Sequence, residues 1–274
     1  MSRFPTFFVN HGGGPCFFMD PPPGWPSDTW DGMAHFLRGL DASIGRRPRA
    51  VIIVSGHWEE RKPTVNSGAH PPLLFDYGGF PPHTYQLTWP APGAPDVAAE
   101  VRELLEQAGF ETGENDRRGY DHGVFVPFKL IYPDADVPVV QLSLLASLDA
   151  AQHLAMGRAL ASQRDTGVLI VGSGMSHHNL SDFFSGRGND AAEAFDAWLG
   201  DAVSDPGVRE ASLAGWQDAP GGRSAHPRPE HLLPLMVAAG AAPGESAERV
   251  FHGHVLGKPF SAFRFGGDID LDRG

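Results

Sequence analysis

Histidines follow three apolar runs of this sequence, each where the run gives way to small or turn residues. They are His11 in "VNHGGG", His57 in "VSGHWEE" and His178 in "GSGMSHHN". The carboxyl ends of parallel strands lie at one edge of a sheet, and open α/β folds bind their ligands at that edge. Several neutral imidazoles gathered in one place are typical of a metal site. We therefore predict a metal centre at this edge.

Two more segments carry histidines suited to the same site. In "SAHPRPEHLLPLMVAAGAAP" we expect His231 to lie in the opening turn of a buried helix and to point toward the same edge. His226 stands before that helix and is the weaker candidate. His122 follows Asp121 and precedes a buried run. An imidazole beside a metal but not bound to it is suited to general acid/base catalysis. Asp121 would either orient this ring or cap a helix.

Three glycines, Gly12–Gly14, come directly after His11. Glycine lets the backbone turn sharply and lie close to a bound ion and its substrate, where a β-carbon would obstruct. A phosphate-binding loop is the less favoured interpretation, because no lysine lies near and no Gly-Lys-Ser/Thr continuation follows.

The elements that must position these residues alternate between strand and helix patterns, which predicts an α/β fold. We expect a single catalytic domain over residues 1–274, with a central, largely parallel or mixed sheet flanked by helices and the metal site at the carboxyl ends of the strands. Continuous apolar runs, typical of strands covered on both faces, lie at 6–9, 50–56, 137–144 and 167–174. Helices are expected at 96–110, 150–164 and 189–203.

One long segment, residues 66–95, fits no regular element and is dense in proline, glycine and aromatic residues. Connections of this length inside a compact domain are usually functional or disordered, and the aromatic residues argue against disorder. We interpret it as a loop that folds over a site or forms a contact in a homo-oligomer.

Composition excludes several classes of partner. The formal net charge is −12, and no run of lysines or arginines occurs, so neither nucleic acid nor an anionic membrane is expected as a partner. No stretch has the roughly 18 consecutive apolar residues of a membrane span, and the first residues lack the pattern of a signal peptide. The one cysteine, Cys16, excludes an internal disulfide and fits a reducing compartment. We therefore expect a cytoplasmic protein.

Seven ordered motifs, spread from about residue 7 to 266, together carry a family resemblance. They are "NHGGGP", "VSGHWE", "FDYGGFPPHTYQLTWPAPG", "YDHGVFVPFKLIYPDADVPVVQLSL", "GSGMSHHN", "HPRPEHLLPLMVAAGAA" and "SAFRFG". This set resembles the class III extradiol aromatic ring-opening dioxygenases, and within them the DOPA 4,5-dioxygenase (DODA-like) branch. The resemblance implies that a catechol such as DOPA is opened with O2.

The resemblance also implies roles for the histidines. It makes His11, His57 and His231 metal ligands, and it makes His178 either a fourth ligand or an acid/base beside the metal. His122 matches a second acid/base histidine of the pocket, whereas His177 has no match and is interpreted as structural.

The resemblance leaves the metal open. The ion would be Fe(II), as dioxygenase activity requires, or Zn(II), which accepts all-histidine sites readily. More distant relatives have a glutamate where this chain has His231, directly after Glu230.

Two other functions use the same histidines. A zinc-dependent hydrolase would hold water in the open position of the metal and would work without oxygen. A non-catalytic metal-binding protein would have a closed site and would bind no catechol. Four aromatic residues flank the motif histidines and either wall a pocket or belong to the core: Phe17, Phe18, Trp58 and Phe125.

Overall fold

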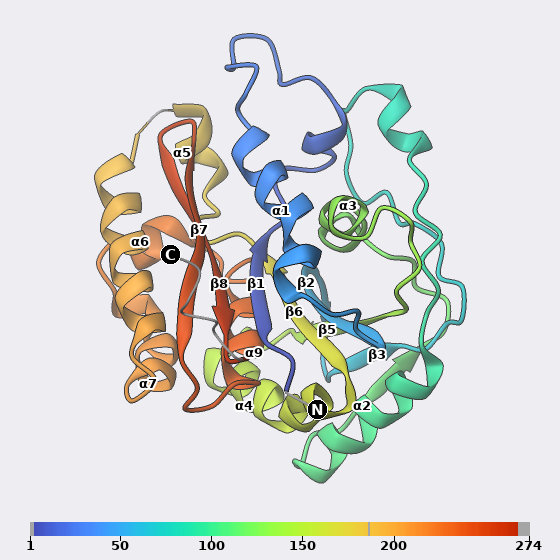
Figure 1. The fold of residues 1–274 in the computed structure, drawn as a ribbon. Coiled ribbons are helices and arrows are strands. Elements are labelled where there is room, and N and C mark those ends of the chain that lie inside the picture. The colour runs from blue at the N-terminus through green and yellow to red at the C-terminus, as the bar shows by residue number, and fades with distance from the viewer. Residues whose placement is uncertain (1–2, 186, 268–274) are drawn as a thin grey trace.

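The computed structural model describes residues 3–185 and 187–267, in which eight strands form one mixed sheet (Figure 1). The strand order is β4-β3-β5-β2-β6-β1-β8-β7. The strands are β1 (Thr6–Asn10), β2 (Ala50–Glu60), β3 (Thr64–Asn66), β4 (Gly113–Asn115), β5 (Val139–Leu145), β6 (Val168–Gly174), β7 (Ala247–Val255) and β8 (Lys258–Phe265). The central strands β5, β2, β6 and β1 are parallel to one another. Next to them, β3 is antiparallel to β5 and β8 is antiparallel to β1, and the outer strands pair parallel in β3–β4 and antiparallel in β7–β8. The predicted α/β fold with a mixed sheet is confirmed.

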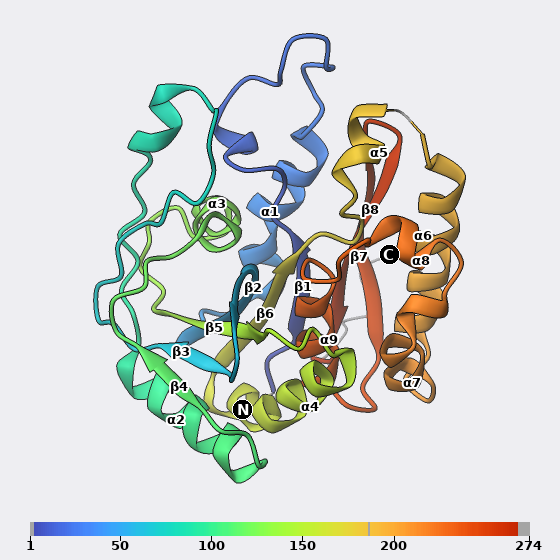
Figure 2. The same ribbon diagram turned by 180° about the vertical axis from the view of Figure 1, so that it is seen from behind.

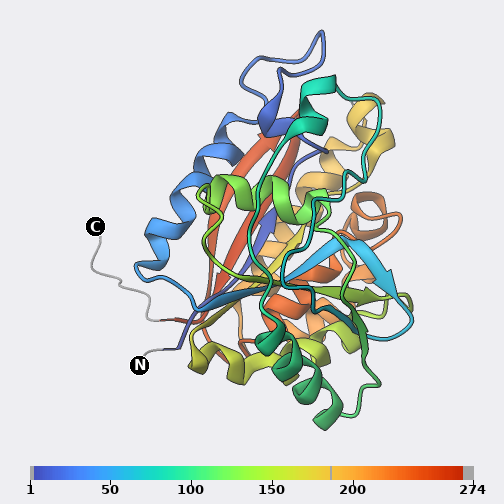
Figure 3. The same cartoon turned by 90° about the vertical axis from the view of Figure 1, so that its right-hand side faces the viewer.

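Helices cover both faces of this sheet, as the views from the front, back and side show (Figures 1, 2 and 3). One face carries α1 (Asp31–Ile44) and α3 (His122–Ile131), and the other carries α2 (Pro95–Gln107), α4 (Ala150–Leu160), α6 (Asn189–Ser204) and α9 (Leu233–Gly240). Shorter helices are α5 (Leu180–Ser185), α7 (Arg209–Ala214) and α8 (Gly222–Ala225). Alternate side chains of the strands enter opposite cores: Ile52 and Val54 enter one, and Val51 and Ile53 the other. This explains why the strand sequences are apolar throughout.

The strands and helices expected from the sequence are present, with two informative differences in length. The helix expected at 150–164 is α-helical only to Leu160 and continues as a 3-10 helix, Ala161–Thr166. The strand expected at 50–56 runs on to Glu60, and its pairing with β5 shifts register between Val54 and Glu59. His57 therefore lies within an irregularity of β2 rather than after its end. Such irregularities re-aim side chains at the edge of a site.

The expectation that His231 lies in the opening turn of a helix is wrong. Helix α9 begins at Leu233, so His231 belongs to the turn that precedes it. The carbonyl of Pro229 closes that turn by accepting the N–H groups of Leu232 and Leu233. Pro234 falls in the first turn of α9, where its missing N–H removes no helical hydrogen bond.

The loop at 66–95 contains a 3-10 turn, Pro82–Gln86, and isolated backbone bridges tie it to other segments at two points. Leu73 forms a bridge with Tyr120, and Gly93 forms one with Val139. The loop therefore runs beside the start of α3, where His122 lies, and it is fixed to the sheet at its far end. In the described part of the chain, no helix has the length and apolar character needed to cross a membrane.

Replacing Gly93 with alanine is expected to destabilise the protein by about 1–3 kcal/mol, the usual effect of forcing extra atoms into packed structure. A β-carbon at this position would lie 1.8 Å from the carbonyl oxygen of Gly68, which is backbone and has little freedom to move. Urea unfolding measures the change. Gly78→Ala is the matched control, because a β-carbon there meets open space. Equal free energies of unfolding for the two variants would contradict the expected anchoring of the loop.

Candidate metal centre

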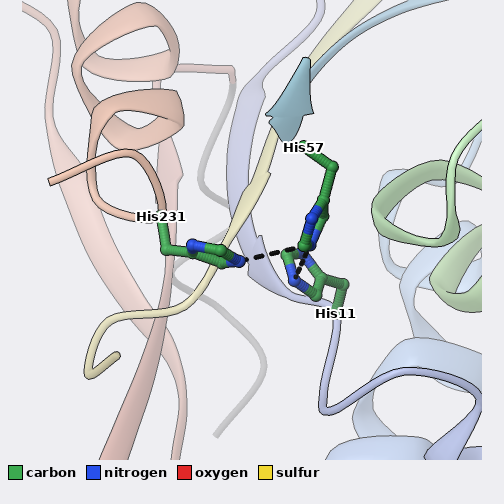
Figure 4. A group of neighbouring side chains, drawn as sticks. All are labelled: His11, His57 and His231. Atoms are coloured by element: carbon green, nitrogen blue, oxygen red, sulfur yellow. Dashed lines mark hydrogen bonds between the residues drawn. The ribbon is translucent and has the colours of Figure 1, made fainter. Parts of the chain in front are cut away.

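Three histidines from distant parts of the sequence point toward one another (Figure 4). His11 follows β1, His57 lies in β2 and His231 precedes α9. The Nε2 atom of His57 lies 3.1 Å from Nε2 of His11 and 3.2 Å from Nε2 of His231. One ligand atom from each ring falls within 4.8 Å of the others. We call these three side chains the histidine triad.

The end of β6 holds two members of the triad in place. The backbone N–H of His11 donates to the carbonyl of Gly174, and the N–H of Met175 donates to the carbonyl of His231. A β-carbon at Gly174 would lie 2.0 Å from the His231 carbonyl oxygen, so only glycine lets the two segments cross this closely. The strand thus organises the triad, although the histidines that follow it, His177 and His178, are not members of the triad.

Oxygen atoms face the other ring nitrogen of every triad histidine. Nδ1 of His11 lies 3.2 Å from the Ser173 hydroxyl, whose own proton goes to the carbonyl of Gly123. Nδ1 of His231 lies 2.9 Å from Oε1 of Glu230, and Nδ1 of His57 faces Oδ2 of Asp76 at 3.7 Å. The Ser173 and Glu230 oxygens accept the Nδ1–H protons of His11 and His231, so Nε2 of each of these two rings keeps a free lone pair, whereas Asp76 lies beyond hydrogen-bond distance of His57.

Burial keeps the triad rings neutral. It lowers the pKa of His57 to about 4, and the nearby imidazole of His122 lowers it further. Burial also holds the pKa of His11 and that of His231 well below the ordinary value, again with help from neighbouring imidazoles. Neutral nitrogens bound 2.0–2.1 Å from one ion lie about 3 Å apart. The donor set therefore fits a divalent metal.

A carboxylate of the long loop orients His122. Oδ1 of Asp76 accepts the Nδ1–H of His122 at 2.8 Å and the backbone N–H of the same residue at 3.0 Å. Burial alone would raise the pKa of Asp76, but the hydrogen bonds from His122 outweigh it and lower the pKa below its ordinary value. The His122 ring lies 3.9 Å from that of His57, measured between centroids. Asp76 thus faces both rings, a role for which the sequence offered no signal.

Asp121 has neither of the roles expected for it. It occupies the residue before α3, but its side chain accepts no capping hydrogen bond from the helix. Its buried carboxylate instead accepts hydrogen bonds from Ser55 at 2.7 Å, from Arg118 at 3.0 Å and from Gln141. Asp121 has this role because β2, β5 and the segment before α3 meet around its carboxylate.

A second carboxylate, Glu230, faces His178 and His231 together. Oε1 of Glu230 lies 3.3 Å from Nδ1 of His178, and the two imidazole rings stack at a centroid distance of 3.5 Å. Burial would raise the pKa of Glu230, but the hydrogen bonds from both histidines hold it well below its ordinary value. His178 groups with Glu230 and His231 rather than with His11 and His57. Asp76 and Glu230 therefore each face one triad histidine and one histidine outside the triad.

The remaining histidine candidates lie elsewhere. His226 is buried, with Nε2 donating to the carbonyl of Ser176 and with Phe195 and Trp216 against its ring. His177 is also buried and meets Phe183 and Phe260 edge to face.

A cavity of about 380 Å³ opens beside the triad, but none of the four flanking aromatic residues lines it. Trp58 and Phe125 are buried in the core, and Phe17 and Phe18 pack against an apolar cluster. The aromatic residues that do line the cavity are Trp25, Trp30, Phe80 and Phe183. The sequence does not mark these four residues as lining a site, because none of them lies next to a triad histidine in the chain.

The glycines after His11 form the turn expected of them. Gly12 and Gly14 have φ of +79° and +56°, and both line the cavity. A β-carbon at Gly14 would lie 2.7 Å from the ring of Phe80, which packs against the turn.

Comparisons with known proteins agree with this geometry. Residues 5–262 match the family model described as the catalytic LigB subunit of aromatic ring-opening dioxygenase. The 4,5-DOPA dioxygenase extradiol of Beta vulgaris is 38% identical over 90% of each chain. The dioxygenase tasH of Hapsidospora irregularis is 36% identical over 97% of this chain and 87% of its own. The crystal structure of an uncharacterized protein, JW3007 of Escherichia coli K12, superposes with a TM-score of 0.73 at 30% identity, covering 96% of this chain and all of the other.

These matches span nearly the whole chain and favour a dioxygenase over the hydrolase alternative. Together with the cluster of histidines able to hold a metal, they settle the class of enzyme. The chain belongs to the LigB family of aromatic ring-opening dioxygenases and is a metal-dependent extradiol dioxygenase.

Proposed function

We propose that the histidine triad holds one Fe(II) ion and that the enzyme opens the ring of a catechol such as DOPA with O2. The observation that carries this proposal is the convergence of three neutral Nε2 atoms, 3.1 and 3.2 Å apart, at the wall of an aromatic cavity. The names of relatives such as the Beta vulgaris enzyme support DOPA as a representative substrate. Fe(II) held by the triad would supply the redox chemistry that a catechol and O2 require, which Zn(II) would not, because it has no accessible redox change.

His122 is proposed as the base that accepts a proton from a catechol hydroxyl. Its Nδ1–H is committed to Asp76, which leaves the Nε2 lone pair free on a ring that lines the cavity. Asp76 is a positioning residue, since it fixes both the ring and its tautomer. General acid/base help of this kind contributes on the order of 10²–10⁴-fold.

His178 is proposed as a second acid/base group, in preference to a fourth metal ligand. Its ring lies flat against His231, and its Nδ1 is held by Glu230. The two acid/base candidates thus stand on different sides of the triad, one beside His57 and one beside His231. A catechol between them would have one imidazole for each proton transfer.

The proposal extends to the whole chain and its surroundings. Residues 1–274 are proposed to form one catalytic domain. The enzyme is proposed to act in the cytoplasm, since Cys16 is a free, buried thiol that suits a reducing compartment.

Anaerobic reconstitution tests the function. The protein is stripped of metal, loaded with Fe(II) or Zn(II), mixed with DOPA and then exposed to oxygen. We expect the Fe(II) protein to consume about one O2 per catechol and to form a yellow ring-opened product, and the Zn(II) protein to do neither. Intact catechol across a broad panel with stoichiometric iron would contradict the proposed function.

A further inference from the structure

The cavity extends well beyond the histidines, and its outer walls are apolar. Three segments build them: the loop between β1 and α1, the long loop at 66–95, and α5. They contribute Trp25, Trp30, Phe80 and Phe183. A volume of about 380 Å³ falls in the range of pockets that enclose whole small-molecule ligands, so a catechol ring at the triad leaves room for a substituent.

No lysine or arginine is among the described residues that line this cavity. Asp20 contributes the one carboxylate among those lining residues. Arg118 and Arg228, which contact residues around the triad, are engaged by Asp121 and by Glu59 and Glu230. A substrate carboxylate in the cavity would therefore lose its water without gaining a cationic side chain, which is unfavourable.

The rim of the cavity repeats this apolar character. Leu180, the first residue of α5, lines the cavity and is 59% exposed, more than any other large apolar side chain in the described part of the chain. Pro21 and Pro22 line the cavity as well. Leu180 stands two residues after His178, and Asn179 between them fixes the start of α5 through its hydrogen bonds to Ser181 and to the carbonyl of Ser224. The apolar rim is thus held at a set position relative to the proposed acid/base group.

We propose that the preferred substrate is a catechol with an uncharged alkyl or aryl substituent, which fills the apolar cavity and covers Leu180. This proposal rests on the proposed function and refines it, because it places such catechols above DOPA, whose amino-acid group is charged. Each methylene that enters the cavity should raise kcat/KM about fourfold, equivalent to about 0.8 kcal/mol.

A matched panel of catechols tests the preference. It comprises 4-ethylcatechol, 4-butylcatechol, dopamine, 3,4-dihydroxyphenylacetate and DOPA, each assayed with the Fe(II) protein for kcat/KM. We expect 4-butylcatechol to be best and the two carboxylate-bearing catechols to be at least about tenfold below 4-ethylcatechol. Equal or higher kcat/KM for DOPA would overturn the proposal.

Binding without turnover separates this proposal from the proposed function. Trp25 and Trp30 line the cavity, so a ligand there should quench tryptophan fluorescence in the anaerobic protein. Trp25→Phe identifies the part of the signal that comes from the cavity. If no catechol is opened, the proposed function fails, but the order of binding affinities still decides the preference: tighter alkylcatechols support it, and tighter carboxylates overturn it.

Leu180→Arg should change the preference in a predictable direction. A cation at the rim would attract a substrate carboxylate and remove an apolar contact, so kcat/KM for 3,4-dihydroxyphenylacetate relative to 4-ethylcatechol should rise about fivefold or more. Val208→Arg is the matched control: Val208 is 50% exposed and lies before α7, outside the cavity lining. Thermal melting verifies that both variants fold. The same ratio in both variants would overturn the proposal.

Discussion

Replacing His57 with alanine is expected to abolish metal binding and, with it, ring opening. The Nε2 atom of His57 lies within 3.2 Å of the corresponding atom in each of the other two triad histidines. Because its removal leaves two imidazoles, the affinity for Fe(II) should fall by more than about 100-fold, beyond the 10–100-fold that losing an outer partner of a ligand costs. Metal content after dialysis, measured by mass spectrometry, gives the result directly.

His70→Ala is the control for this change. His70 is exposed and belongs to the long loop, so its loss should leave the metal content unchanged. Stoichiometric iron in the His57→Ala protein would show that the triad is not the metal site. The assignment of His11 and His231 as ligands would then fail as well, because His57 stands between them.

Replacing His122 with alanine is expected to lower kcat by about 10²–10⁴-fold while the metal remains bound. The three Nε2 atoms of the triad do not depend on His122, whose Nδ1 is held by Asp76 rather than by a triad residue. The expected result is therefore a low turnover with an unchanged metal content. Oxygen consumption and metal analysis on the same sample measure the two quantities.

Two further measurements make this result specific. Added imidazole should restore part of the activity, since it can enter the space left by the missing ring. His35→Ala, at an exposed position of α1, should retain full turnover. An unchanged kcat in the His122→Ala protein would assign the proton transfer to another group, with His178 the first to examine.

The positions of two carboxylates agree with the proposed division of the histidines into metal ligands and acid/base groups. Asp76 faces His57 and His122, and Glu230 faces His231 and His178. Each carboxylate thus faces one proposed ligand and holds one proposed acid/base group beside the triad.

Much of the fold and the core of the site are determined by local sequence. The runs at 6–9, 50–56 and 167–174 are apolar because strands in the middle of a parallel sheet are covered on both faces. The parallel pairing of β1 and β2 with β6 brings His11, after β1, and His57, within β2, to the same edge of the sheet. Local sequence does not determine the residue at which α9 begins, because the turn closed by Pro229 depends on packing across Gly174.

Only the tertiary structure decided which groups support these histidines. Asp76 reaches His122 because the loop at 66–95 pairs with the segment before α3, and no local pattern marks that contact. For the same reason Asp121 turned out to bind Ser55, Arg118 and Gln141 rather than His122. The residues that line the cavity come from segments far apart in the chain. The apolar character of its walls therefore cannot be predicted from any one of these segments. The spacing of apolar residues along a segment predicts which of its side chains pack in the core. Contacts between loops depend instead on the path of the whole chain.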